Sequence, residues 1–114
     1  HKGLNDLPGV TCSMPGGAFY AFPNISGTGM NGSEFSKKCM HEAGVAIVPG
    51  TAFGNTSQDY VRFSFAASQD NIQKALEKIK KMLTKWHLSI LTQNNLTCKV
   101  FKWLTCKCQK LKNL

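Results

Sequence analysis

The chain has 114 residues, of which 42% are hydrophobic and 18% charged, a composition that suits one small globular domain. No apolar run reaches the ~18 residues of a transmembrane helix, so we expect no membrane span. The net charge is +8, but the residues after position 80 hold seven lysines and no acid, which excludes a basic nucleic-acid-binding surface spread over the whole chain.

The first predicted strand covers Ala18–Phe22, an apolar and aromatic run that ends at Pro23. Residues 1–17, which precede it, are interrupted by proline and glycine, and this predicts an extended segment. Residues 24–32, which follow it, contain three glycines and predict a loop.

The first predicted helix begins at Ser33, whose hydroxyl can accept a backbone N–H of the first turn. Phe35, Cys39 and Ala43 recur every four residues and form an apolar stripe for burial. Gly44 suits the left-handed conformation that ends a helix, so we expect a helix of about ten residues.

Two further strands are predicted. The apolar run Val45–Val48 indicates a buried strand that ends at Pro49 and Gly50. After a loop over residues 51–59, the segment Tyr60–Phe65 alternates large apolar residues with Tyr, Arg and Ser, which is typical of a strand with two different faces.

The last predicted helix runs from Ser68 to about Lys85, with Asp70 near its N-terminus and apolar residues at helical spacing. Together the elements predict an α+β fold, in which a small sheet of about three strands is packed by two helices. Residues 87–114 contain no Asp, Glu, Gly or Pro, and their weak apolar periodicity is compatible with a basic amphipathic helix.

Five cysteines make an odd count with irregular spacing, which argues against a disulfide framework and favours a reducing compartment. We therefore predict a cytoplasmic protein with free thiols and no zinc site, because Cys106 and Cys108 are too closely spaced and no His pair completes them. The chain begins at His1 without an apolar leader, so we expect no signal peptide. It also lacks an initiator Met, which indicates a chain that begins mid-protein or after processing, and hence a fragment.

Arg62 is the only arginine of the chain and lies on the third predicted strand, on the face opposite its large apolar residues. A planar guanidinium can bind a carboxylate through two parallel hydrogen bonds, and a strand holds that group more rigidly than a loop. Spacing alone leaves two interpretations open, a solvated surface arginine and an anion-binding site.

Four segments follow one another in the chain: PGGAFYAFP at Pro15–Pro23, EAGVAIVPG at Glu42–Gly50 with Phe53–Gly54, YVRFSFA at Tyr60–Ala66, and the helical segment Ser68–Leu83. In this order they resemble the small C-terminal domain of the class I aminotransferases, the aspartate aminotransferase fold type that depends on pyridoxal phosphate. Each segment is weakly specific, whereas the ordered set, which covers about residues 8–85, is strongly specific.

The resemblance implies that Arg62 binds the α-carboxylate of an amino acid substrate and so orients it. It places Phe19 and Tyr20 near the mouth of the active site as candidate substrate contacts, although core packing would also explain both residues. The residues Pro49, Gly50, Phe53 and Gly54 match a turn near the substrate in the family. The ordinary preference of proline and glycine for turns would also explain these residues. Ser64 is expected to be a structural hydrogen-bonding residue.

The family binds its cofactor through a lysine that follows a serine, and only Ser36–Lys38 is superficially similar, inside a predicted helix and without the following glycines. The acid and the aromatic residue that hold the cofactor ring belong to the large domain and have no counterpart here. The resemblance therefore implies a small C-terminal domain at residues 1–85. Pyridoxal 5'-phosphate would be bound only in the full-length parent, and the chain alone would bind no cofactor and would not transaminate.

The expected partners are an amino acid or 2-oxo acid substrate, the large domain of the same enzyme, and a second copy in a homodimeric parent; nucleic acid and membrane are not expected. Residues 86–114 depart from the family pattern and leave several interpretations open: a natural basic extension, a disordered tail, or non-family sequence beyond a lost exon boundary or reading frame. The competing hypotheses for function are an inactive truncated product and a small basic module that binds RNA or an anionic membrane through its lysines.

Overall fold

The computed structural model describes residues 1–93. One compact unit spans His1–Thr84, and a second unit begins at Lys85. The expectations for residues 94–114, including the basic amphipathic helix and its binding functions, lie outside the described residues. The division into a domain at 1–85 and a separate tail therefore stays a prediction.

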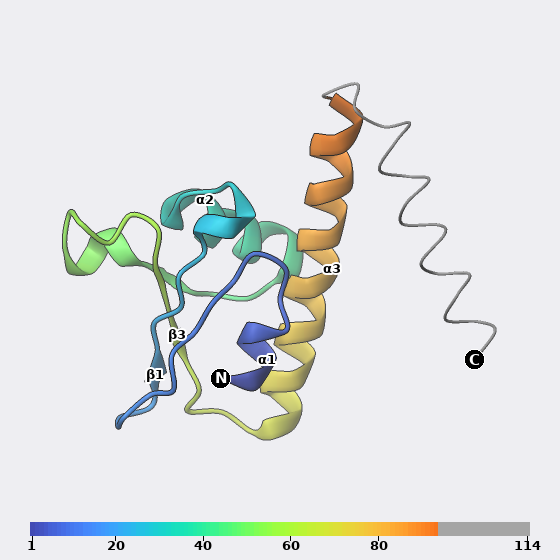
Figure 1. Ribbon diagram of the computed structural model, residues 1–114. Helices are drawn as coiled ribbons and strands as arrows, with labels where there is room; N and C mark the ends of the chain where they lie inside the picture. The colour runs from blue at the N-terminus through green and yellow to red at the C-terminus, as the bar shows by residue number, and fades with distance from the viewer. Residues whose placement is uncertain (94–114) are drawn as a thin grey trace, which may run out of the picture. The chain divides into compact units, whose positions relative to one another are not determined.

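The first unit contains a three-stranded antiparallel sheet, shown in Figure 1 beside its helices, which confirms the predicted α+β class. β3 (Val61–Ser64) lies in the middle, between β1 (Tyr20–Ala21) and β2 (Val48–Pro49). Tyr20 pairs with Ser64, and Val48 pairs with Arg62. The arginine therefore occupies the central strand of the sheet.

The prediction of a buried strand over Val45–Val48 is wrong in both bounds and burial. The residues before Val48 have no strand partner, and Ala46 is exposed whereas Ile47 is buried. Pro49, expected to end the strand, instead belongs to it and faces Val61 across the pair. A proline is tolerated there because β2 is an edge strand and its missing N–H breaks no central ladder.

α2 (Gly32–Lys38) continues into a π-helical turn (Cys39–Ala43), and the predicted stripe of Phe35, Cys39 and Ala43 is confirmed as fully or nearly fully buried. Gly44 ends the helix with φ of +65°, as predicted.

The cap of α2 is Asn31, and the expectation that Ser33 fills this position is wrong. The Asn31 side chain accepts the N–H of Glu34 at 2.9 Å, and the Glu34 carboxylate accepts the Asn31 N–H at 3.2 Å. This reciprocal pair satisfies two backbone N–H donors at once, those of Asn31 and Glu34.

The extended segment expected at residues 1–17 instead begins with a short helix, α1 (Lys2–Asn5), followed by a turn. Leu4 and Leu7 are buried, so local burial of leucine side chains overrides the proline and glycine signals. α1 lies beside α3 in Figure 1, and a Cβ added to Gly3 would meet the side chain of Leu76.

α3 (Gln69–Gln93) begins where predicted, and the Ser68 hydroxyl accepts the N–H of Asn71 at 3.3 Å. The predicted end near Lys85 is wrong, because no glycine or proline follows within the described residues to stop the helix. Ile79 and Leu83 are fully buried on the face toward the unit's core. Within residues 1–93, no helix combines the length and the apolarity needed to cross a bilayer.

The core of the first unit forms where the loop after β1, α2, β3 and the first half of α3 contribute fully buried side chains. The largest of these are Phe35, Ile25, Ile79, Leu83 and Val61. This core packs against the face of β3 that carries Val61, and it leaves the opposite face, which carries Arg62, partly exposed.

Candidate functional site

The alternation of β3 determines which of its residues can act as a site. Val61 is fully buried, and Arg62, the next residue along the strand, is half-buried on the opposite face. β3 is the central strand, with β1 on one side and β2 on the other, and Arg62 itself pairs with Val48 of β2. The guanidinium is thus held on the most constrained part of the sheet.

Two aromatic rings lie against the guanidinium. Its central carbon is 4.3 Å from the ring centroid of Tyr20, on β1, and 4.5 Å from that of Phe53. Phe53 ends a single 3₁₀ turn (Gly50–Phe53) that follows β2 directly. The two rings therefore approach Arg62 from opposite sides of β3, one from β1 and the other from the turn after β2. Both distances are within the range of cation–π attraction.

Gly50 determines where that turn can lie. Its N–H donates to the carbonyl oxygen of Tyr60 at 2.8 Å, which ties the turn to the residue before β3. A Cβ at position 50 would stand 2.6 Å from this oxygen and would also collide with the carbonyl oxygen of Ser57. Only glycine permits this close approach of two backbones, and the approach brings Phe53 to Arg62.

Three more rings surround the first two. Phe22 stacks on Tyr60 at 5.2 Å between centroids with an interplanar angle of 9°, and meets Phe53 edge-on at 6.0 Å. Phe19 lies tilted against Tyr20 at 4.5 Å. The rings next to Arg62 are therefore themselves held by aromatic contacts.

The hydrogen-bond donors of Arg62 are not used by the described part of the chain. Within residues 1–93, no hydrogen bond or ion pair engages the guanidinium, and the salt bridge seen there joins Lys38 to Glu42 at 2.9 Å. The ring faces offer no acceptor in the plane of the guanidinium. The arrangement can therefore bind an external planar anion such as a carboxylate through the fork of N–H groups.

Of the other two predicted site residues, Tyr20 lies against this group and Phe19 lies against Tyr20. Tyr20 touches the guanidinium, Phe19 touches Tyr20, and both are exposed, at 37% and 50%, so core packing does not explain them. Ser64 accepts the N–H of Ala66 at 3.4 Å, in keeping with the structural role predicted for it.

Sequence reasoning missed the contact of Phe53 with Arg62 and assigned Phe53 to the turn alone. The two residues are nine positions apart, and only the close backbone approach at Gly50 brings them together. A cluster of aromatic residues on both sides of a lone arginine was the available signal, because rings of Phe and Tyr are common neighbours of guanidinium groups.

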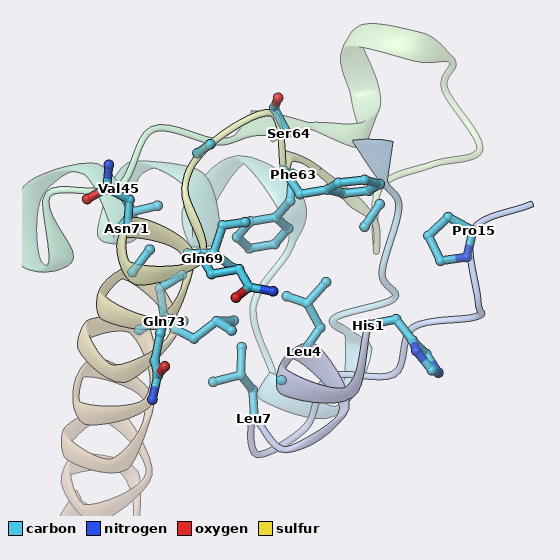
Figure 2. A pocket seen from close by; sticks show the side chains of 18 of the residues that line it. His1, Leu4, Leu7, Pro15, Val45, Phe63, Ser64, Gln69, Asn71 and Gln73 are labelled. Atoms are coloured by element: carbon cyan, nitrogen blue, oxygen red, sulfur yellow. The ribbon is translucent and has the colours of Figure 1, made fainter. Parts of the chain in front are cut away.

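The opposite side of the sheet carries a different feature, an apolar groove of about 1160 Å³ that Figure 2 shows from close by. Leu4 lines it from α1, Leu7 from the turn after α1, Phe63 from β3, and Ile72 and Leu76 from α3. In Figure 2 the hydroxyl of Ser64 points away from this hollow. The groove is lined mainly by hydrocarbon, whereas the Arg62 side carries a cation.

Two cysteines of the described chain, Cys12 and Cys39, are free and buried. Burial, and secondarily the charge of Glu42, raises the pKa of Cys39 to about 12, and burial also raises the pKa of Cys12. Both thiols are therefore neutral at physiological pH and poor nucleophiles. No group of His, Cys, Asp and Glu within residues 1–93 is arranged to hold a metal ion.

The serine–lysine pattern at Ser36–Lys38 does not fit a cofactor anchor. Ser36 is buried in α2, Lys37, the lysine directly after it, is exposed, and Lys38 is paired with Glu42 one helical turn later. The helix continues into the π-helical turn Cys39–Ala43, and no glycine follows Lys38 within that turn.

Comparison with known proteins gives the family of this fold. The family model for aminotransferase class I and II matches residues 1–79. The aspartate aminotransferase of Pyrococcus horikoshii is 46% identical over 82 residues, which covers 72% of this chain and 21% of that enzyme. The aromatic-amino-acid aminotransferase 2 of Thermococcus litoralis is 42% identical over 82 residues, again 72% and 21%.

A solved structure agrees with these relatives. The aromatic aminotransferase from Pyrococcus horikoshii OT3 superposes with a TM-score of 0.72 at 40% identity, and covers 76% of this chain and 23% of that one. The chain thus spans about a fifth of the length of the curated relatives it matches.

Proposed function

The chain belongs to the class I and II aminotransferases, and we propose that Arg62 binds the α-carboxylate of the amino acid or 2-oxo acid substrate within a complete enzyme of this kind. In this proposal residues 1–85 act as the small C-terminal domain, and residues 86–114 stand outside the family fold. The complete enzyme transfers an amino group from an amino acid to a 2-oxo acid.

The observation that carries the proposal is the state of the guanidinium. It lies on the central strand with rings on two sides, and its N–H groups have no acceptor within residues 1–93. An arginine that served only stability would be expected to pair with a carboxylate or a carbonyl of its own chain. Recognition of an external carboxylate requires a guanidinium that is fixed in position and whose N–H donors are not already paired.

The residues of this chain bind and orient, and they do not supply the reacting group. Arg62 would fix the carboxylate end of the substrate, and Phe19 and Tyr20 would contact the substrate at the rim of the site. Pyridoxal phosphate, on which the family depends, supplies the electron sink for amino group transfer in the complete enzyme. Because Ser36–Lys38 lies within a helix and Lys38 is paired with Glu42, we expect this chain alone to bind no cofactor and to show no transaminase activity.

The remaining parts of the proposal follow the family. The large domain of the same enzyme would complete the site, and the parent would be a homodimer. Two described thiols that are free and buried are compatible with a reducing, cytoplasmic location.

A chimera tests the role of Arg62 directly. Residues 1–85 replace the matching segment of the aspartate aminotransferase from Pyrococcus horikoshii, which is 46% identical to this chain. The chimera with Arg62 should transaminate. Arg62→Leu should lower kcat/KM by about 100-fold, because a buried charge-assisted pair to the substrate is lost. Arg62→Lys should lie between the two, because an ammonium keeps the charge without the fork.

Two controls separate this effect from misfolding. Phe65→Leu changes an exposed ring directly after the end of β3 and should leave kcat/KM within about twofold of the chimera. The thermal unfolding midpoint of each chimera shows whether it folds. An Arg62→Leu chimera that folds and retains full kcat/KM would remove the proposal.

A further inference from the structure

Tyr20 and Phe53 form what we call the aromatic clamp of Arg62. Their ring centroids lie 4.3 and 4.5 Å from the guanidinium carbon. One ring comes from the strand on one side of β3, and the other comes from the turn that follows the strand on the other side. The clamp therefore reaches the arginine from two directions that the sheet topology fixes independently.

The clamp residues are not packed into the core. Tyr20 is 37% exposed and Phe53 is 50% exposed, although burial is the usual arrangement of a large ring. Each is held by another ring instead, Tyr20 by Phe19 and Phe53 by Phe22. Stability of the fold alone does not require exposed rings at these positions, so their contact with the guanidinium needs a further explanation.

The chemistry of the two groups supplies one. A ring face attracts a guanidinium electrostatically but accepts no strong in-plane hydrogen bond, so the N–H groups remain available. A free arginine side chain samples many rotamers and must lose that freedom when it binds an anion. Rings on two sides restrict the side chain before the anion arrives, and this lowers the entropic cost of binding.

We infer that Tyr20 and Phe53 are positioning residues, which hold the guanidinium of Arg62 in the orientation that accepts a carboxylate. They act through Arg62, and Phe53 needs no contact with the substrate. This inference rests on the proposed carboxylate-binding role of Arg62. It adds a function for Phe53, and for Tyr20 a second function besides contact with the substrate.

The full chain offers a direct probe, because Arg62 is its only arginine. Labelling with ¹⁵N-arginine gives one Nε–Hε resonance, and a proton above a ring face is shifted upfield. Sodium acetate, as the simplest carboxylate, is titrated into the labelled chain, with sodium chloride at equal ionic strength as the reference.

The test compares leucine variants of the clamp with two controls. Tyr20→Leu and Phe53→Leu should each move the free Nε–Hε resonance downfield and weaken acetate binding by about two- to fivefold, the range of an exposed cation–π contact. Tyr20→Phe keeps the ring and removes only the hydroxyl, so it should leave the free Nε–Hε resonance at its upfield position. Phe65→Leu removes a ring of similar exposure, 38%, that lines the opposite groove, and should change neither the resonance nor acetate binding.

The outcomes distinguish the clamp from the function on which it rests. Acetate binding equal to the wild type in both leucine variants would overturn the clamp and leave the role of Arg62 intact. A wild-type chain that binds no acetate would count against the proposed function. In that case the Nε–Hε resonance of Arg62 without acetate tests the clamp by itself. A resonance that does not move in either leucine variant would contradict the clamp. The two leucine variants are independent, so misfolding of one leaves the other to decide.

Discussion

The two faces of the four-residue strand β3 serve different purposes. On one face Val61 is fully buried and Phe63 lines the apolar groove. On the other face Arg62 keeps its charge and its hydrogen-bond donors exposed between two rings. Successive side chains of a strand point to opposite faces, so one short segment can anchor the core and present a cation at adjacent positions.

This difference indicates that different residues of the same strand contribute to stability and to ligand recognition. Apolar burial accounts for the core face, and its loss should appear in the free energy of unfolding. The arginine face gains little from burial, so its loss should appear in ligand binding. The following predictions test that separation, from the largest expected effect on stability to the smallest.

Gly50→Ala should have the largest effect, because it disrupts the close backbone approach that ties the turn Gly50–Phe53 to Tyr60. The added Cβ would meet the carbonyl oxygens of Ser57 and Tyr60, which belong to the backbone and cannot rotate away. We expect a loss of about 3 kcal/mol in the free energy of unfolding, measured by urea denaturation. Gly16→Ala is the matched control, since a Cβ there meets nothing within 4 Å and should change stability by less than about 0.5 kcal/mol.

Val61→Ala and Arg62→Met compare the two faces directly. Val61→Ala removes two fully buried methyl groups and should lower the free energy of unfolding by about 2 kcal/mol. Arg62→Met keeps an unbranched side chain against the rings and should change it by less than about 0.5 kcal/mol. Urea denaturation measures both, and a larger loss in Arg62→Met than in Val61→Ala would contradict the separation.

Asn31→Ala tests whether α2 depends on its observed cap. Loss of the reciprocal bonds with Glu34 should lower the free energy of unfolding by about 1 kcal/mol. Ser33→Ala, at the position that the sequence favoured, should cost less than about 0.5 kcal/mol. Equal losses in the two variants would show that the capping box contributes nothing.

The ionisation of the Cys39 thiol should change the free energy of unfolding at alkaline pH only. Its pKa is raised to about 12 in the folded chain against an ordinary value of 9.0, so above pH 9 the unfolded chain binds fewer protons than the folded one. Stability from this group is complete below pH 9 and falls as the pH rises toward 12. The loss should be about 1 kcal/mol between pH 9 and pH 10. Cys39→Ala should show a pH slope smaller by this amount in urea denaturation at each pH.

Periodic patterns in the sequence predicted the parts of the fold that repeat. The alternation Tyr60–Phe65 identified the two faces of β3, and the spacing of Phe35, Cys39 and Ala43 identified the buried face of α2. Both follow from local geometry, because a strand repeats every two residues and a helix about every 3.6. The same alternation located Arg62 on its strand, and the family resemblance predicted its role.

Features that depend on competition or tertiary contact were not predictable. Asn31 and Ser33 both suit a helix cap, and only the reciprocal bond with Glu34 favours the first. Burial of Leu4 and Leu7 depends on α3, more than 60 positions later in the chain. The contact of Phe53 with Arg62 depends on a backbone approach that no pattern of side chains records.

The most direct measurement of the central claim uses the single arginine resonance of the unmodified chain. Phenylpyruvate and its carboxamide are titrated separately into the ¹⁵N-arginine-labelled protein at constant ionic strength. A guanidinium that binds a carboxylate should show a saturable shift of the Nε–Hε resonance with phenylpyruvate, at a Kd on the order of 10 mM for a partly exposed pair, and none with the carboxamide. Identical responses to the acid and the amide would show that Arg62 does not recognise the carboxylate.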